Sequence, residues 1–229
     1  MLYITGDTHR DFRRIFALCD TVNSTKNDIL IILGDAGINY SGEPNDSRLK
    51  QELAQLPITL FCIHGNHEMR PQAISSYQKS IWYGGTVLIE PEYPNLIFAK
   101  DGEVYNIDDR SYLAIGGAYS VDKEVRLLRG HGWWADEQPS AEIKADVEHT
   151  LNNINFKTDI VLSHTCPLKY EPVEMFLSGI DQSKVDKSTE VWLDNIEDRL
   201  TYQRWYCGHY HTDKTIDKLR FLFQDILQL

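Results

Sequence analysis

The sequence lacks several features that would place the protein in other classes. No run among its 229 residues is apolar over the length needed to cross a lipid bilayer. Residues 1–7 contain no positively charged region and no small-residue cleavage site, so we expect no signal peptide. The four cysteines form no C-x-x-C pair, which argues against a zinc knuckle or a thioredoxin-type site, and disulfides are not expected without secretion. We therefore expect a cytoplasmic protein with no membrane partner.

Positive charge is also scarce. The chain has 23 lysines and arginines against 34 acidic residues, and its formal net charge is −11. Such a surface repels polyanions, so we expect no long nucleic acid as partner, although a small phosphate ester remains compatible with it. No repeat, low-complexity segment or linker divides the chain. Its length suits one large α/β domain, which we expect to cover residues 1–229.

Short apolar runs bounded by glycine and polar residues predict buried strands in the first part of the chain. The first three such runs are residues 2–5, 28–33 and 58–63. Apolar residues recur at helical spacing from Phe12 to Val22, and a second helix is predicted from Asn45 onward. This order has the length of successive strand–helix–strand units, which place their strands in parallel.

The middle of the chain has a different pattern. Four strand candidates follow one another without helices between them, at residues 86–89, 95–99, 103–107 and 111–115. Their close spacing predicts antiparallel pairing. Helices are predicted at residues 139–153 and 189–200, and further strands at 158–163, 203–207 and 220–224. Two mixed sheets packed face to face, with helices outside, fit this order.

The apolar end of the chain, residues 221–227, allows two interpretations. It could pair with a second copy across a dimer, or it could be buried in the sheet of its own chain, which we favour. The oligomeric state stays open.

Five short polar segments stand out because each follows an apolar strand candidate. They are Gly6-Asp7-Thr8-His9, Gly34-Asp35, Gly65-Asn66-His67-Glu68, Ser163-His164 and Gly208-His209-Tyr210-His211. Side chains beyond the carboxyl ends of parallel strands converge on one crevice. Their carboxylate, imidazole and amide groups suit Mn²⁺, Fe or Zn²⁺. A lone histidine is usually structural, and we interpret His64, His131 and His149 in that way. Seven candidate ligands in equivalent positions instead predict a metal site.

These segments, which lie between residues 6 and 211, resemble the motif set of the calcineurin-like metallophosphoesterases. The resemblance implies a four-layer αββα sandwich of two mixed β-sheets. It also implies two divalent metal ions, with Mn²⁺ favoured over Fe and Zn²⁺. One ion would be held by Asp7, His9, Asp35 and His211. The other would be held by Asp35, Asn66, His164 and His209, so that Asp35 bridges the two. His67 matches the general acid of the family.

The resemblance implies hydrolysis of a phosphate ester by a hydroxide that both metals activate, with His67 protonating the leaving oxygen. Two divalent ions, two aspartates and one hydroxide would carry a net charge of about +1, which attracts phosphate to an acidic protein. The protein serine/threonine phosphatases of the superfamily extend the second motif to Gly-Asp-x-Val-Asp-Arg-Gly. Here Gly34-Asp35 is followed by Ala36-Gly37-Ile38-Asn39-Tyr40, which lacks both the second aspartate and the arginine. A protein phosphatase is therefore disfavoured, and what orients His67 stays open.

Residues that select the substrate are expected in the segments 36–45, 69–84 and 116–138. The candidates for substrate contact are Arg70, Tyr119, Arg126 and Arg129, because arginine binds phosphate and aromatic rings stack on bases. The two later arginines could instead form only salt bridges, and for Trp133 and Trp134 packing is slightly favoured over substrate contact.

A nucleotide or another small phosphodiester is the favoured substrate. The alternative is a phosphomonoesterase acting on a small metabolite or a phosphoprotein. A non-catalytic scaffold is disfavoured because every ligand and the acid histidine are present.

Overall fold

The strands predicted to be parallel form the centre of one β-sheet. The computed structural model describes residues 1–229. Its first sheet has the order β13-β1-β2-β3-β6-β5-β4. The central strands β1 (Leu2–Thr5), β2 (Ile29–Ile32), β3 (Thr59–Cys62) and β6 (Leu96–Ala99) run parallel to one another. The remaining strands of this sheet are antiparallel to their neighbours: β13 (Ile226–Gln228), β5 (Gly85–Ile89) and β4 (Gln78–Trp82).

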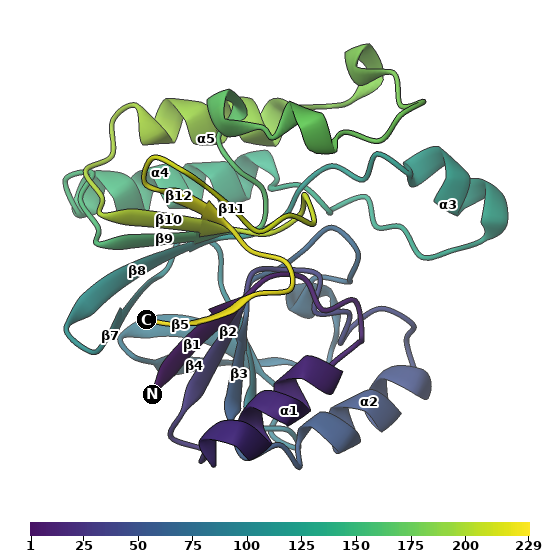
Figure 1. Ribbon diagram of the computed structural model, residues 1–229, viewed down its shortest axis with the longest axis vertical. Helices are drawn as coiled ribbons and strands as arrows, with labels where there is room; N and C mark the ends of the chain where they lie inside the picture. Colours follow the sequence, from purple (N-terminus) through teal and green to yellow (C-terminus); the bar gives the residue numbers. More distant parts are fainter.

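A second sheet of six strands packs against the first (Figure 1). Its order is β11-β12-β10-β9-β8-β7. The parallel centre consists of β12 (Leu219–Phe221), β10 (Arg204–Cys207), β9 (Ile160–Ser163) and β8 (Arg110–Ile115). The antiparallel edges are β11 (Lys214–Ile216) and β7 (Val104–Ile107).

Helices cover the outer face of each sheet (Figure 1). The helices of the first sheet are α1 (Arg13–Val22) and α2 (Asn45–Leu53), and those of the second are α4 (Ala141–Asn153) and α5 (Ser188–Glu197). Alternate residues of β2 face the two sides, because Ile31 packs between the sheets and Leu30 packs toward α1 and α2. Strands covered on both faces have few polar positions, which is why they are continuous apolar runs in the sequence. The predicted αββα sandwich is confirmed.

The structure also departs from the sequence-based prediction. β4, β11 and the short helix α3 (Lys123–Arg129) were not predicted, and the expected final strand is divided into β12 and β13. Antiparallel pairing holds within β5–β6 and within β7–β8, but β6 and β7 lie in different sheets and β6 is parallel to β3. The chain end pairs with β1 of its own sheet, as favoured from the sequence. None of the helices has the length and apolar character required to cross a bilayer.

Candidate metal centre

The five polar segments lie at the carboxyl ends of five parallel strands. β1, β2 and β3 carry the first three segments, and β9 and β10 of the other sheet carry the last two. Several of these turns need a left-handed backbone: φ is 45° at His9, 47° at Asp35, 67° at His209 and 49° at His211. Left-handed non-glycine residues are uncommon and concentrate at functional sites. At Gly65 a Cβ atom would overlap the side chain of Asp35, so only glycine permits this approach.

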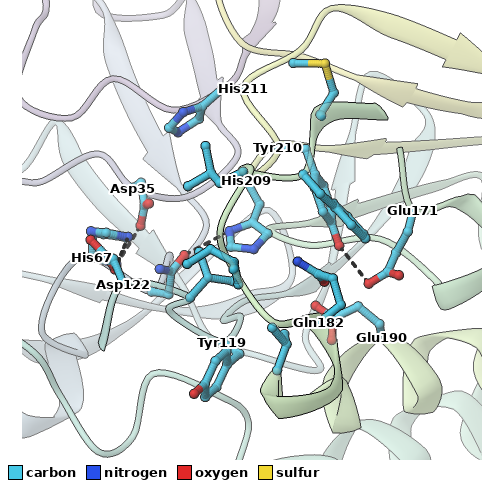
Figure 2. Close-up of a pocket in the computed structure, with 17 residues that line it drawn as sticks. Asp35, His67, Tyr119, Asp122, Glu171, Gln182, Glu190, His209, Tyr210 and His211 are labelled. Atoms are coloured by element: carbon cyan, nitrogen blue, oxygen red, sulfur yellow. Dashed lines mark hydrogen bonds and ion pairs between the residues drawn. The ribbon is translucent and has the colours of Figure 1, made fainter. Parts of the chain in front are cut away.

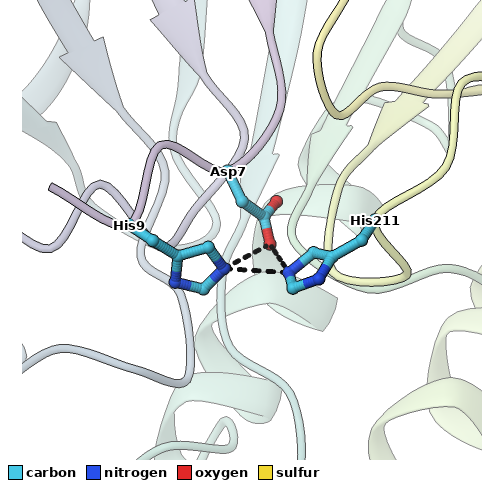
Figure 3. A group of neighbouring side chains, drawn as sticks. All are labelled: Asp7, His9 and His211. Carbon is cyan, nitrogen blue, oxygen red and sulfur yellow. Dashed lines mark hydrogen bonds and ion pairs between the residues drawn. The ribbon is translucent and has the colours of Figure 1, made fainter. Parts of the chain in front are cut away.

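The first group of candidate ligands is Asp7, His9 and His211 (Figure 3). The Nε2 atoms of the two histidines are 2.8 Å apart, and they lie 3.6 and 3.3 Å from Oδ2 of Asp7. Asp35 Oδ2 is 3.9 Å from Nε2 of His9. Two ligands bound at about 2.1 Å and at right angles to each other would lie about 3 Å apart, which is close to this spacing. Oδ2 of Asp7 is buried and has no hydrogen-bond partner.

The second group is Asn66, His164 and His209, with Asp35 beside it. Asn66 Oδ1 is 2.8 Å from Nε2 of His164 and 3.1 Å from Nδ1 of His209. Asp35 Oδ1 lies 3.7 Å from the same Nε2. Nδ1 of His164 faces the carbonyl oxygen of Leu33 at 2.7 Å, so it carries the proton and Nε2 presents its lone pair. Oδ1 of Asn66 and Nε2 of His164 therefore face each other with lone pairs and no proton between them.

The electrostatics of these residues suit a cation. Burial raises the pKa of Asp35. Burial also acts to raise the pKa of Asp7, but the adjacent imidazole of His211, 3.3 Å away, and the other nearby imidazoles lower it overall. Burial and the neighbouring His164 lower the pKa of His209 to about 3, which keeps that imidazole neutral. Buried carboxylates, imidazole nitrogens and an orphaned oxygen form a donor set that fits divalent cations.

His67 is held by two residues of the segment around α3. One terminal nitrogen of Arg126 contacts Nδ1 of His67, and Nε of Arg126 donates to Oδ2 of Asp122 at 2.9 Å. Oδ1 of Asp122 lies 3.9 Å from Nε2 of His67. The guanidinium group and the carboxylate therefore lie at opposite nitrogens of the imidazole. Asp122 thus places beside His67 a carboxylate of the kind that the second motif lacks, whereas Arg126 contacts the ring and does not line the cavity.

Glu68 supports the turn on which Asn66 and His67 lie. Its fully buried carboxylate accepts hydrogen bonds from the backbone nitrogens of Gly37 at 3.0 Å and Gly65 at 3.3 Å. Burial, and next the charge of Asp35, raise the pKa of Glu68 to about 8. This residue joins the second and third motifs.

The residues expected to contact substrate have different positions. Tyr119 lines the cavity described below. The guanidinium of Arg126 is engaged by Asp122, His67, Gly132 and Tyr40, and Arg129 is exposed at the end of α3. Arg70 is buried outside the cavity, where Asp101 at 2.6 Å and the carbonyl oxygen of Asp136 at 2.7 Å hold it.

The two tryptophans also lie outside the cavity. The ring of Trp133 lies under the ammonium group of Lys123 at 4.1 Å, and that of Trp134 packs edge-on against Tyr40. This arrangement agrees with the packing role favoured from the sequence.

A cavity of about 320 Å³ opens beside the candidate ligands (Figure 2). One side carries Asp35, His67 and His209, and Tyr119 and Asp122 belong to the wall predicted from residues 116–138. Another side is built by residues 171–190, which were not expected there. This segment is irregular apart from short 3₁₀ turns and the start of α5, so no strand-end pattern marked it. Ser120, which accepts a hydrogen bond from Asn66 at 2.9 Å, was missed as well.

Comparisons with known proteins identify the family of the chain and support its fold. The sequence matches the family model described as calcineurin-like phosphoesterase over residues 2–213. The crystal structure of TT1561 from Thermus thermophilus superposes with a TM-score of 0.53 at 10% identity, covering 97% of this chain and 87% of that chain. AQ665 from Aquifex aeolicus, a protein of unknown function, gives a TM-score of 0.34 at 14% identity, covering 75% and 81%. At these identities a structural likeness concerns the fold alone. No curated protein matches the sequence.

Proposed function

The chain belongs to the calcineurin-like phosphoesterase family, and we propose that it hydrolyses a small phosphodiester with the help of two divalent ions, preferably Mn²⁺. The proposed ligands of one ion are Asp7, His9, Asp35 and His211. Those of the other are Asp35, Asn66, His164 and His209. When bound, such ions acidify water and neutralise the charge of a transferring phosphoryl group.

His67 is the proposed general acid. Hydrolysis consumes one water: a bond forms between its oxygen and phosphorus, the bond from phosphorus to the departing alcohol breaks, and that alcohol must gain a proton. To act as the acid, His67 would carry a second proton, and transfer of one proton to the alcohol would return the imidazolium to a neutral ring; the carboxylate of Asp122, 3.9 Å from Nε2, favours the charged form. Asp122 and Arg126 would orient the ring during the reaction.

The composition of the cavity wall supports a diester. Apart from the proposed metal ligand Asp35, the residues that line the cavity include three carboxylates, namely Asp122, Glu171 and Glu190, and neither a lysine nor an arginine. Such a wall repels the second negative charge of a monoester dianion, whereas a diester carries one charge and presents a second organic group. Apolar side chains from Met175 to Ile180 offer surface for that organic group.

Two model substrates test the proposal. With Mn²⁺ present, we expect bis(p-nitrophenyl) phosphate to be hydrolysed with a kcat/KM at least about tenfold above that of p-nitrophenyl phosphate, and a chelator should abolish both reactions. Turnover of the monoester alone would refute the diester assignment and favour a phosphomonoesterase. Fewer than one bound metal per chain, with no rescue by Mn²⁺, would instead indicate a non-catalytic binding module.

A further inference from the structure

Glu190 is a buried carboxylate in the cavity that the proposed hydrolysis does not use. Its side chain lines the cavity, yet the residue is only 4% exposed. Oε1 accepts a hydrogen bond from the hydroxyl of Thr165 at 2.7 Å, whereas Oε2 has no hydrogen-bond partner. A buried acceptor without a partner is costly unless a ligand or water satisfies it.

The charge of Glu190 also has no cationic partner. The neighbouring Glu171 forms an ion pair of 2.6 Å with Lys187, and the same ammonium group lies over the ring of Phe176 at 4.8 Å. No lysine, arginine or histidine lies within ion-pair distance of Glu190. Its position in the first turn of α5 gives the carboxylate partial support from the helix dipole. Oε2 of Glu190 is therefore an acceptor in the cavity that a hydrogen-bond donor of a bound molecule can satisfy.

Aromatic and aliphatic residues line the same part of the cavity as Glu190. The rings of Phe176 and Tyr210 are nearly parallel, with centroids 6.3 Å apart and an interplanar angle of 26°. Ile180 and Val185 add aliphatic surface, and the side-chain amide of Gln182 faces the cavity without a bond to the protein. Figure 2 shows Glu190, Gln182 and Tyr210 on the side of the cavity away from His67 and Asp35. We call Phe176, Gln182, Glu190 and Tyr210 the base wall.

We propose that the base wall binds the nucleobase of a nucleotide ester, with an N–H group of the base edge donating to Oε2 of Glu190. This inference takes the hydrolysis of a phosphodiester from the proposed function and identifies one of the two organic groups of that ester as a nucleoside. A heteroaromatic base combines apolar faces, which stack on aromatic rings, with donors confined to its edge. A small ammonium ion would satisfy the carboxylate but would lose its hydration shell to apolar walls, so the base fits better.

Binding of matched nucleotide analogues tests the proposal without requiring turnover. The probes are the 5′-methylenephosphonates of adenosine, guanosine and purine riboside, whose carbon–phosphorus bonds resist hydrolysis. Purine riboside keeps the ring but lacks the exocyclic amino group. By calorimetry on the Mn²⁺-loaded protein, we expect adenosine or guanosine phosphonate to bind about tenfold or more tightly than the purine riboside phosphonate. Equal affinities for all three would overturn the proposal.

Variants assign the preference to Glu190. Glu190→Ala should reduce the difference between the analogues to less than about threefold, because the acceptor is gone. Glu142→Ala, at an exposed position of α4, should keep the wild-type difference. An undiminished preference in Glu190→Ala would refute the assignment, and metal content and thermal unfolding verify that the variant is folded. If that variant does not fold, Glu190→Gln gives the same comparison with little change in shape.

The outcomes separate the two proposals. Hydrolysis of bis(p-nitrophenyl) phosphate by the wild-type protein reports on diesterase activity alone, since this ester carries no N–H group. If the protein hydrolyses this diester but binds all three analogues equally, the proposed reaction is supported and the base wall is refuted. If the protein discriminates the analogues but hydrolyses only monoesters, the base wall is supported and the diester assignment is refuted.

Discussion

Asp35 and His67 are adjacent in space, yet their substitution should have different consequences. The backbone nitrogen of His67 donates to Oδ1 of Asp35 at 2.8 Å, so the two residues share one hydrogen bond. Asp35 is proposed to bind both ions, whereas the imidazole of His67 contacts Asp122 and Arg126 and is not among the proposed ligands. Metal content and leaving-group dependence can therefore be separated.

We expect His67→Ala to keep both ions but to lose about 10²- to 10⁴-fold in kcat on alkyl diesters, which need a protonated leaving group. The loss should be much smaller for p-nitrophenyl esters. Asp35→Asn should reduce occupancy of both ions together because it removes the shared charge. Metal analysis and steady-state kinetics measure these effects, with His149→Ala on the exposed side of α4 as the control. Equal, near-wild-type activity in both variants would refute the assignment.

At the scale of elements, α3 is the part of the site that was least visible in the sequence. It has seven residues, none of them buried, and Leu127 and Leu128 are exposed. An isolated helix of this length has no amphipathic face to indicate it. Figure 1 shows α3 standing apart from both helical layers. The residues around it nevertheless deliver Asp122 and Arg126 to His67.

We expect Asp122→Asn to lower kcat on alkyl diesters by about tenfold or more while metal content stays unchanged. The amide leaves Nε2 of His67 without a negative partner, so the imidazole is less well oriented for proton transfer. The positioning role predicts a smaller effect on p-nitrophenyl diesters and little change in KM. Glu124→Gln, on the exposed face of the same helix, is the control. A loss of equal size on both substrates would indicate a general structural defect instead.

The sequence predicts elements well where burial on two sides leaves a repeated pattern. β1 has the expected bounds, and β2, β3, β9 and β10 lie within the expected ranges because their apolar runs are continuous. β4 was missed because its polar, half-exposed residues resemble a loop. The proposed ligands could be predicted because each one follows such a strand. Glu190 gives no comparable signal, since only the folding of residues 171–190 over the site turns it into a cavity residue.

At the scale of the whole molecule, the candidate metal centre depends on both sheets. Asp7, Asp35 and Asn66 follow strands of the first sheet, whereas His164 and His209 follow strands of the second. The ligands meet only when the sheets pack through the core between them. A centre of this kind favours the packed state by mass action, because the unpacked chain has no preformed site. Binding of metal ions at this centre is therefore expected to stabilise the packing of the two sheets against each other.

The free energy of unfolding of the whole protein should depend on pH because the carboxyl group of Glu190 is buried. Burial raises the pKa of Glu190 to about 7 from an ordinary value of 4.5, despite the hydrogen bond from Thr165 and the charge of Lys187. The folded protein binds the carboxyl proton of Glu190 more tightly than the unfolded chain does. The resulting contribution to the free energy of unfolding is fully present below about pH 4.5, where Glu190 is neutral in both states. It is lost progressively as the pH rises through about 7. Glu171 adds to the shift as a second negative charge.

Glu190→Gln should remove this pH dependence, because the amide has no charge to bury and can still accept a hydrogen bond from Thr165. Relative to the wild type, we expect the variant to gain about 2 kcal/mol in unfolding free energy between about pH 5 and pH 8. Urea unfolding of both proteins at matched metal concentration measures the difference, in which effects on the metal ligands cancel. A difference that does not change with pH would mean that Glu190 ionises normally in the folded protein. A growing difference would mean that the protein keeps a destabilising carboxylate in its cavity, as expected where a binding group is retained at the expense of stability.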